Sequence, residues 1–105
     1  MIMVLPEWLH RTLRIPYLLK VTKTGSGRPI VFLHGLASFK EIWSPVTVVL
    51  SRDNCCISLD LLGHGRSPKP THIQYTPHDH LRSIRWTLFW HGVWRRPIVV
   101  GHSMG

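Results

Sequence analysis

Acidic side chains are scarce in this sequence of 105 residues. Only 5 Asp and Glu stand against 13 Lys and Arg, which leaves a formal net charge of +8. A small chain this basic raises nucleic acid or an anionic membrane surface as partners. The basic residues are scattered, however, with no block of five like charges and no nucleic-acid-binding motif. We therefore interpret the charge as a solvated basic surface and predict no nucleic-acid partner.

Long apolar runs are also missing. No segment approaches the ~20 apolar residues of a membrane-spanning helix. The opening of the chain is apolar for only five residues before Pro6 and Glu7, which is too short for the hydrophobic core of a signal peptide. The sequence thus predicts a protein without stable membrane insertion, and we expect it in the cytoplasm.

Cysteine is nearly absent. The two that occur, Cys55 and Cys56, are neighbours in the apolar run "NCCISLD". Neighbouring residues on a strand point to opposite faces, so a disulfide between them would be strained. They also lack the spacing of a zinc or redox pair. We predict two buried, reduced cysteines and no metal site.

The sequence does contain enough apolar material for one globular domain. Hydrophobic residues make up 44% of the chain, and the mean hydropathy is +0.03. A compact chain of this length buries roughly 65% of its unfolded surface. There are no internal repeats. We assign residues 1–14 to an N-terminal extension and residues 15–105 to the core of a single domain.

Four apolar or β-branched runs predict strands. The first, residues 15–25, ends in the turn signal Gly25-Ser26-Gly27 and is expected to be antiparallel to its neighbour. The other three are continuous apolar runs, typical of strands buried on both faces of a parallel sheet: residues 29–35, 55–60 and 98–102.

Two helices are predicted between these strands. The first runs from Ser38 to about Leu50, with Ser38 as its N-cap and Glu41 completing a capping box. The second runs from its N-cap Thr76 to about Trp94. The alternation of strand and helix predicts an α/β fold, with a mostly parallel sheet and flanking helices.

The last nine letters, "PIVVGHSMG", take an apolar strand into Gly-x-Ser-x-Gly. A serine hydroxyl is a poor nucleophile unless it has a base, an exposed position and donors for the developing oxyanion. A sharp turn between strand and helix would expose Ser103, and Gly101 and Gly105 would leave room for that turn. The backbone N–H of Met104 would then point into the site. The alternative is a glycine-rich turn with an incidental serine.

Two more motifs follow predicted strands. After the second strand comes "HGLA", where Gly35 would allow a turn with positive φ and the N–H of Leu36 would face a substrate carbonyl. We interpret His34 as an organiser of this turn, hydrogen-bonded inside the core, and not as a base. The third strand leads into "DLLGHGRS". Because ligands gather outside the carboxyl ends of parallel strands, we expect the three motifs to converge.

The segments "VFLHGLASFKEIW", "SLDLLGHGRSPKP" and "PIVVGHSMG", in this order and spacing, resemble the α/β-hydrolase superfamily, and above all its compact esterase, lactonase and C–C hydrolase-like members. The resemblance implies that Ser103 is the nucleophile and that Leu36 and Met104 are backbone oxyanion donors. It places Asp60 in a structural segment, where the side chain would order the following loop through hydrogen bonds to the backbone.

The family's triad has the order Ser, then acid, then His. The resemblance therefore implies that the acid and the base lie beyond Gly105. The chain would be the N-terminal portion of a hydrolase domain, a partial α/β-hydrolase fold that is truncated after the nucleophile-bearing strand. We expect it to be inactive by itself, because none of its eight histidines is placed as the base.

The sequence thus predicts a serine hydrolase that cleaves a carboxylic ester, a lactone or a related small acyl substrate, with no cofactor or metal. Two alternatives stay open: a non-catalytic binding protein on the same fold, and an inactive truncated remnant.

A further pattern is the spacing of Trp86, Trp90 and Trp94, which would form an aromatic stripe on the second predicted helix. We interpret this stripe as a packing surface for a helix that follows Gly105. An aromatic platform for a ligand is the alternative.

Overall fold

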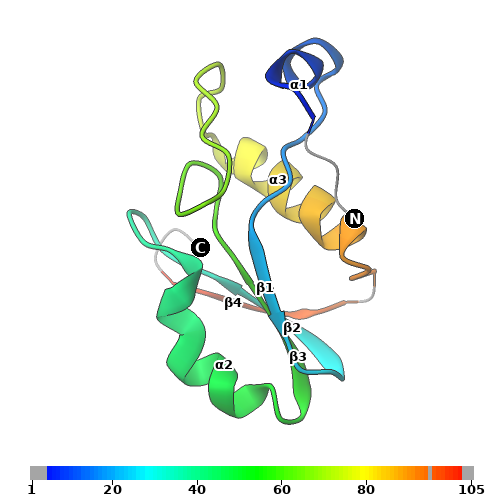
Figure 1. Ribbon diagram of the computed structural model, residues 1–105, viewed down its shortest axis with the longest axis vertical. Coiled ribbons are helices and arrows are strands. Elements are labelled where there is room, and N and C mark those ends of the chain that lie inside the picture. Colours follow the sequence, from blue (N-terminus) through cyan, green and yellow to red (C-terminus); the bar gives the residue numbers. More distant parts are fainter. Residues whose placement is uncertain (1–4, 95, 103–105) are drawn as a thin grey trace.

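The computed structural model describes residues 5–94 and 96–102, and Figure 1 shows how their elements are arranged. The helices are α1 (Glu7–Leu13), the 3₁₀ helix η1 (Lys40–Trp43), α2 (Ser44–Leu50) and α3 (Pro77–Trp90). The strands are β1 (Val21–Thr24), β2 (Arg28–Leu33), β3 (Asn54–Leu59) and β4 (Ile98–Gly101). Each of the three continuous apolar runs therefore forms a strand.

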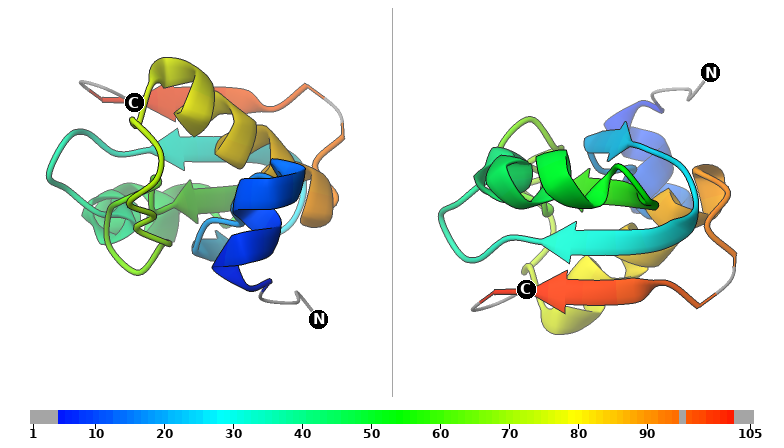
Figure 2. Two further views of the ribbon diagram at one scale, coloured as in Figure 1. Left: turned by 90° about the horizontal axis from the view of Figure 1, so that it is seen from above. Right: turned by 90° about the horizontal axis from the view of Figure 1, so that it is seen from below.

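The strands make one mixed sheet in the order β1-β3-β2-β4. β2 is parallel to both β3 and β4, whereas β1 is antiparallel to β3. Figure 2 shows α3 on one face of the sheet and α2 on the other. The predicted α/β class, with a mostly parallel sheet, flanking helices and an antiparallel first strand, is confirmed.

The central strands β2 and β3 carry the core because both of their faces are covered. On the face of α3, the side chains of Val31, Ile57 and Leu59 have no exposed surface. On the face of α2, Phe32 packs against Trp43 with ring centroids 5.3 Å apart. Burying one such side chain stabilises the fold by about 1.5–3 kcal/mol. Polar and apolar residues do not alternate along these strands because both faces of each strand are buried.

The two cysteines of β3 divide between these faces. Cys55 belongs to the cluster on the side of α3, and Cys56 belongs to the cluster on the side of α2. Both are free and buried, as predicted. Their opposite orientation follows from the alternation of side chains along a strand.

The first predicted helix begins differently from the expectation. Ser38 does not cap it and no capping box with Glu41 forms; instead, the N–H of Ser38 closes a turn. Phe39 is extended, and η1 starts at Lys40, whose N–H donates to the carboxylate of Asp60. A buried carboxylate from the end of β3 therefore takes the place of the N-cap, which a local sequence pattern cannot show.

The second predicted helix is correct at its start and too long at its end. Thr76 caps α3 and forms a capping box with Asp79. The helix stops short of its expected end because Gly92 adopts a left-handed φ of 76°. The N–H of Val93 then returns to the carbonyl of Leu88, as in a Schellman motif.

Trp94 consequently lies outside α3, so the predicted helical stripe of three tryptophans is wrong. Trp86 and Trp90 do meet on the helix, with ring centroids 5.8 Å apart. The indole N–H of Trp94 instead donates to the carbonyl of Phe89. Phe89, Trp90 and Trp94 are each more than half exposed. The helix expected to cover the stripe would follow Gly105 and lies outside the described residues.

The first predicted strand, residues 15–25, is reduced to β1. The backbone of the segment before β1 pairs with side chains of other elements. The N–H of Leu19 donates to Thr87 Oγ1 at 2.9 Å. The N–H of Lys20 donates to Ser67 Oγ at 2.8 Å. Because these partners lie in α3 and in the loop after β3, the segment cannot be recognised as irregular from its own β-branched composition.

The expected N-terminal extension contains α1, a helix that the sequence analysis does not predict. It is tied to the rest of the molecule at its end, where Arg82 of α3 donates to the carbonyl of Arg14 at 2.6 Å. Near its start, Glu7 accepts from His72 at 3.1 Å. Within the described part of the chain, no helix combines the length and the apolar character needed to cross a bilayer.

Candidate active site

The turn after β2, the loop after β3 and the last residues of β4 lie at one edge of the sheet, where these three strands end. Gly101, the last residue of β4, is in register with Leu33, the last residue of β2. The N–H of His102 donates to the Leu33 carbonyl at 3.2 Å, so His102 lies beside the turn after β2. The other residues of the Gly-x-Ser-x-Gly motif are outside the described part of the chain: Ser103, Met104 and Gly105.

The turn after β2 contains the first predicted oxyanion donor. The carbonyl of Gly35 accepts the N–H of Ser38 at 3.2 Å, which closes a β-turn. Leu36 is 71% exposed at its corner, and the Leu36 N–H donates to no residue in 5–94 or 96–102. The left-handed residue is Ala37, with a φ of 58°, and not Gly35 as predicted. The reason is that a turn of the type II pattern needs positive φ at its third position, which is Ala37.

The imidazole of His34 is fully buried beneath this turn and holds two backbone groups. Nε2 accepts the N–H of Leu61 at 2.9 Å, and Nδ1 lies 2.8 Å from the carbonyl oxygen of Gly35. Because a backbone N–H can only donate, the ring proton sits on Nδ1 and is donated to Gly35. Burial lowers the pKa of His34, with His64 acting in the same direction, so the ring is neutral at pH 7.

Asp60, at the carboxyl end of β3, is a second buried anchor. Its carboxylate oxygens accept the N–H of Lys40 at 2.7 Å and the N–H of Arg66 at 3.1 Å. These are side-chain-to-backbone bonds of the kind that the sequence predicts for Asp60. Gly65, with a φ of 53°, passes so close that a Cβ there would lie 2.4 Å from the carboxylate. Glycine is therefore required where the loop crosses Asp60.

Two histidines that the sequence analysis did not select lie near His34. The ring of His64 is 5.1 Å from that of His34. Burial lowers the pKa of His80 at the start of α3, and both His64 and His34 add to this effect. The three residues come from separate loops and a helix, so no spacing in the sequence indicates the cluster. In the part of the chain that the structure describes, no three His, Cys, Asp or Glu side chains are grouped as metal ligands.

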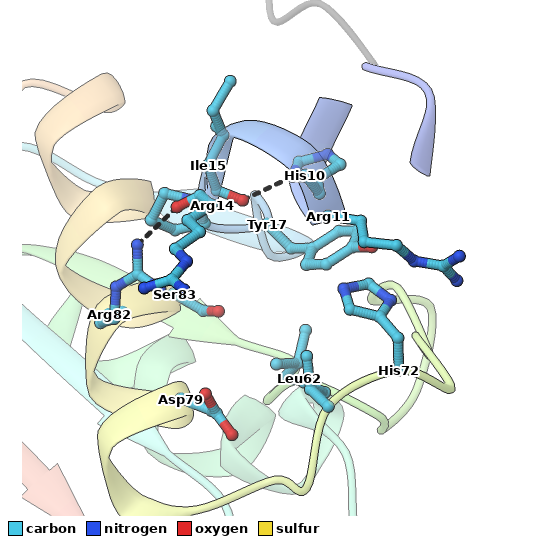
Figure 3. A pocket seen from close by; sticks show the side chains of 12 residues that line it. His10, Arg11, Arg14, Ile15, Tyr17, Leu62, His72, Asp79, Arg82 and Ser83 are labelled. Atoms are coloured by element: carbon cyan, nitrogen blue, oxygen red, sulfur yellow. Dashed lines mark hydrogen bonds between the residues drawn. The ribbon is translucent and has the colours of Figure 1, made fainter. Parts of the chain in front are cut away.

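A cavity of about 230 Å³ lies between α1 and α3, and its lining includes the basic side chains of Arg11, Arg14 and Arg82. Figure 3 shows how these side chains lie around it. Of the predicted site residues that the structure describes, none lines it. A larger cavity of about 610 Å³, which includes Tyr17 and Trp86, does not contain them either. These two cavities therefore give no information on what the motif-bearing edge of the sheet would bind.

The sheet, its flanking helices and the motifs at its carboxyl edge define a protein of the α/β-hydrolase class. The family model described as "alpha/beta hydrolase fold" matches residues 28–105. The chain belongs to this family.

Curated relatives and solved structures support the same family. A probable lysophospholipase, BODYGUARD 2 of Arabidopsis thaliana, is 31% identical over 108 residues that cover 94% of this chain. A haloalkane dehalogenase of Agrobacterium fabrum is 38% identical over 60 residues, or 57% of the chain. The structure of Est816, an N-acyl homoserine lactone degrading enzyme, superposes with a TM-score of 0.77 and 34% identity over 82% of the chain.

This chain is short beside these proteins. It spans 23% of the lysophospholipase, 19% of the dehalogenase and 32% of the Est816 chain. The similar proteins are hydrolases with different substrates, so the family membership supports hydrolase activity and leaves the substrate class to be argued separately.

Proposed function

We propose that this chain is the N-terminal portion of a serine hydrolase domain that cleaves a carboxylic ester, a lactone or a related acyl substrate. One observation carries the proposal. The Leu36 N–H has no partner in the described residues, although the turn around it is held by buried hydrogen bonds at the carboxyl edge of the sheet. A preorganised, unpaired N–H is what stabilisation of an oxyanion needs.

In this proposal Ser103 attacks the acyl carbonyl, and the N–H groups of Leu36 and Met104 bind the oxygen that becomes negative. A histidine takes the proton from the Ser103 hydroxyl and passes it to the leaving group, while an acid orients that histidine. We place both partners beyond Gly105. The reaction needs no cofactor. Residues 1–105 alone would then be inactive.

The choice of a serine mechanism over that of the dehalogenase relative rests on the residue at the nucleophile position, residue 103. By resemblance, the dehalogenase and epoxide-hydrolase branches of the family use aspartate there, whereas this chain has Ser103. The two free, buried cysteines fit the cytoplasmic location that we propose. A binding protein without catalysis, or an inactive remnant, would keep the fold and lack turnover.

The test uses the complete protein that carries these residues. A fluorophosphonate probe should label it at Ser103, and Ser103→Ala should abolish both labelling and hydrolysis of p-nitrophenyl esters. Ser26→Ala, at an exposed serine in the turn between β1 and β2, is the matched control and should change neither. Turnover of esters or N-acyl homoserine lactones that survives Ser103→Ala would remove the nucleophile assignment.

A further inference from the structure

We infer that His34 is a positioning residue: its neutral imidazole, with the proton on Nδ1, sets the direction in which the Leu36 N–H points. This inference rests on the proposed function, because it assigns a purpose to the proposed oxyanion donor. His34 touches no reacting atom in this scheme. It acts through the peptide that joins Gly35 to Leu36.

The peptide between Gly35 and Leu36 links the orientation of two backbone groups. The carbonyl of Gly35 and the N–H of Leu36 belong to one rigid, planar unit and point in opposite directions. Whatever holds the carbonyl oxygen therefore also aims the N–H. The oxygen accepts two hydrogen bonds, from His34 Nδ1 at 2.8 Å and from the N–H of Ser38 at 3.2 Å. Leu36 is an exposed residue, and its N–H, on the opposite side of the peptide, has no partner within the described residues.

The imidazole is itself held in place by the segment that follows the neighbouring strand β3. Nε2 accepts the N–H of Leu61 at 2.9 Å, and the ring has no exposed surface. At the other end of the turn, the Asp60 carboxylate accepts the N–H of Lys40 at 2.7 Å. The segment that carries Leu36 is thus anchored at both of its ends to two consecutive residues that follow β3. Such support is what keeps a strained residue such as Ala37 in its left-handed conformation.

Protonation would break this arrangement. A proton on Nε2 would place two donors face to face, since the N–H of Leu61 cannot accept. The titratable groups that act on the His34 ring are His64, which disfavours the charged form, and Asp60 and Glu41, which favour it. Burial is the dominant influence and keeps the ring neutral.

Two substitutions each remove a different one of the two hydrogen bonds that His34 makes. Asparagine places its amide nitrogen close to the position of Nδ1, so His34→Asn keeps the bond to Gly35 and loses the bond to Leu61. Glutamine reaches the position of Nε2 with its amide oxygen, so His34→Gln keeps the bond to Leu61 and loses the bond to Gly35. A merely structural histidine would respond alike to both, because each variant removes one buried hydrogen bond.

The experiment measures kcat and KM for a p-nitrophenyl ester in the complete protein. We expect His34→Gln to lower kcat by about 10-fold to 100-fold with little change in KM, less than the roughly 10²–10³-fold loss on removing an oxyanion donor outright. His34→Asn, which keeps the bond to Gly35, should lower kcat by a smaller factor than His34→Gln does. Equal losses in both variants, or a larger loss in His34→Asn, would overturn the inference.

Two further measurements complete the test. The ring ¹⁵N shifts of His34 in the wild-type protein should show a protonated Nδ1 and an unprotonated Nε2 at pH 7, and the reverse assignment or a charged ring would overturn the inference even if His34→Gln does not fold. Ser103→Ala, assayed beside them, separates the two proposals. If it is inactive while the His34 pair behaves alike, only the positioning role fails; if it stays fully active, the proposed function fails and the inference falls with it.

Discussion

The carboxylate of Asp60 accepts a hydrogen bond from the backbone N–H of Lys40 at 2.7 Å, across 20 positions of sequence. Its other oxygen accepts the N–H of Arg66. One buried side chain therefore joins the start of η1 to the loop after β3. Both connected segments border the turn that holds Leu36. The conformation of the candidate site therefore depends on the Asp60 side chain, which takes no part in the proposed chemistry.

Asp60→Asn should destabilise the complete protein by about 1–3 kcal/mol, because the amide keeps one acceptor and turns its NH₂ group towards a buried N–H donor. Urea unfolding monitored by tryptophan fluorescence measures the change. Asp53→Asn is the control at an exposed aspartate for which no side-chain hydrogen bond is seen in the described residues, and it should change the free energy of unfolding by less than about 0.5 kcal/mol. Equal effects of the two substitutions would contradict this account of Asp60.

Gly65→Ala tests the close passage of the loop over Asp60. An added Cβ would lie 2.4 Å from the carboxylate, and we expect a loss of about 2–4 kcal/mol from overpacking together with left-handed strain. Gly92→Ala is the matched control: it too has positive φ, at 76°, but its Cβ would meet nothing within 4 Å. Strain alone should then cost about 1–2 kcal/mol. Thermal unfolding of both variants measures the two losses of stability. A loss in Gly65→Ala that is smaller than the loss in Gly92→Ala would refute the clash.

His34 and His80 should make the stability depend on pH. Burial lowers the pKa of both His34 and His80 below the ordinary value of 6.5. As the pH falls below 6.5, the unfolded chain binds more protons at these sites than the folded protein does. Their contribution to the free energy of unfolding is therefore complete above that pH and decreases below it.

Denaturant titrations between about pH 5 and about pH 8 measure this dependence. His34→Asn should reduce the slope of stability against pH, because it removes one of the titrating groups. His78→Gln, at an exposed position of α3, should leave the slope unchanged. The same slope in the wild type and in His34→Asn would contradict the prediction.

Residues 1–105 expressed alone should associate and show no ester turnover. Within the described residues β4 pairs only with β2, and Val99 of β4 is 56% exposed. Together with the aromatic cluster at Phe89, Trp90 and Trp94, this strand presents an uncharged apolar edge to other chains. The net charge of +8 opposes association, and salt screens that repulsion.

Size-exclusion chromatography at low and high salt, near-ultraviolet circular dichroism and p-nitrophenyl ester hydrolysis check this prediction. Association should increase with salt. A sharp monomer peak with a strong tryptophan signal would show that the isolated polypeptide folds well. Turnover that disappears in Ser103→Ala would mean that a base is already present among these residues.

Local sequence patterns predict the structure of a segment correctly where that structure depends on the segment's own residues. The apolar runs of β2 and β3 predict buried strands because burial on both faces leaves no place for polar side chains. The start of α3 is predicted equally well, since Thr76 and Asp79 cap it without help from elsewhere. Gly92 is a local signal for the end of α3 that the prediction of a helix to about Trp94 does not take into account.

The sequence by itself determined the fold class, the burial of the central strands and the position of the motifs at strand ends. Only the tertiary structure decided what holds the turn around Leu36. Because β3 lies beside β2 in the sheet, Asp60 and Leu61 come within hydrogen-bond distance of Lys40 and His34, which are 20 and 27 positions away. Buried backbone groups must find partners, and which partners they find depends on the order of the strands and not on neighbouring letters.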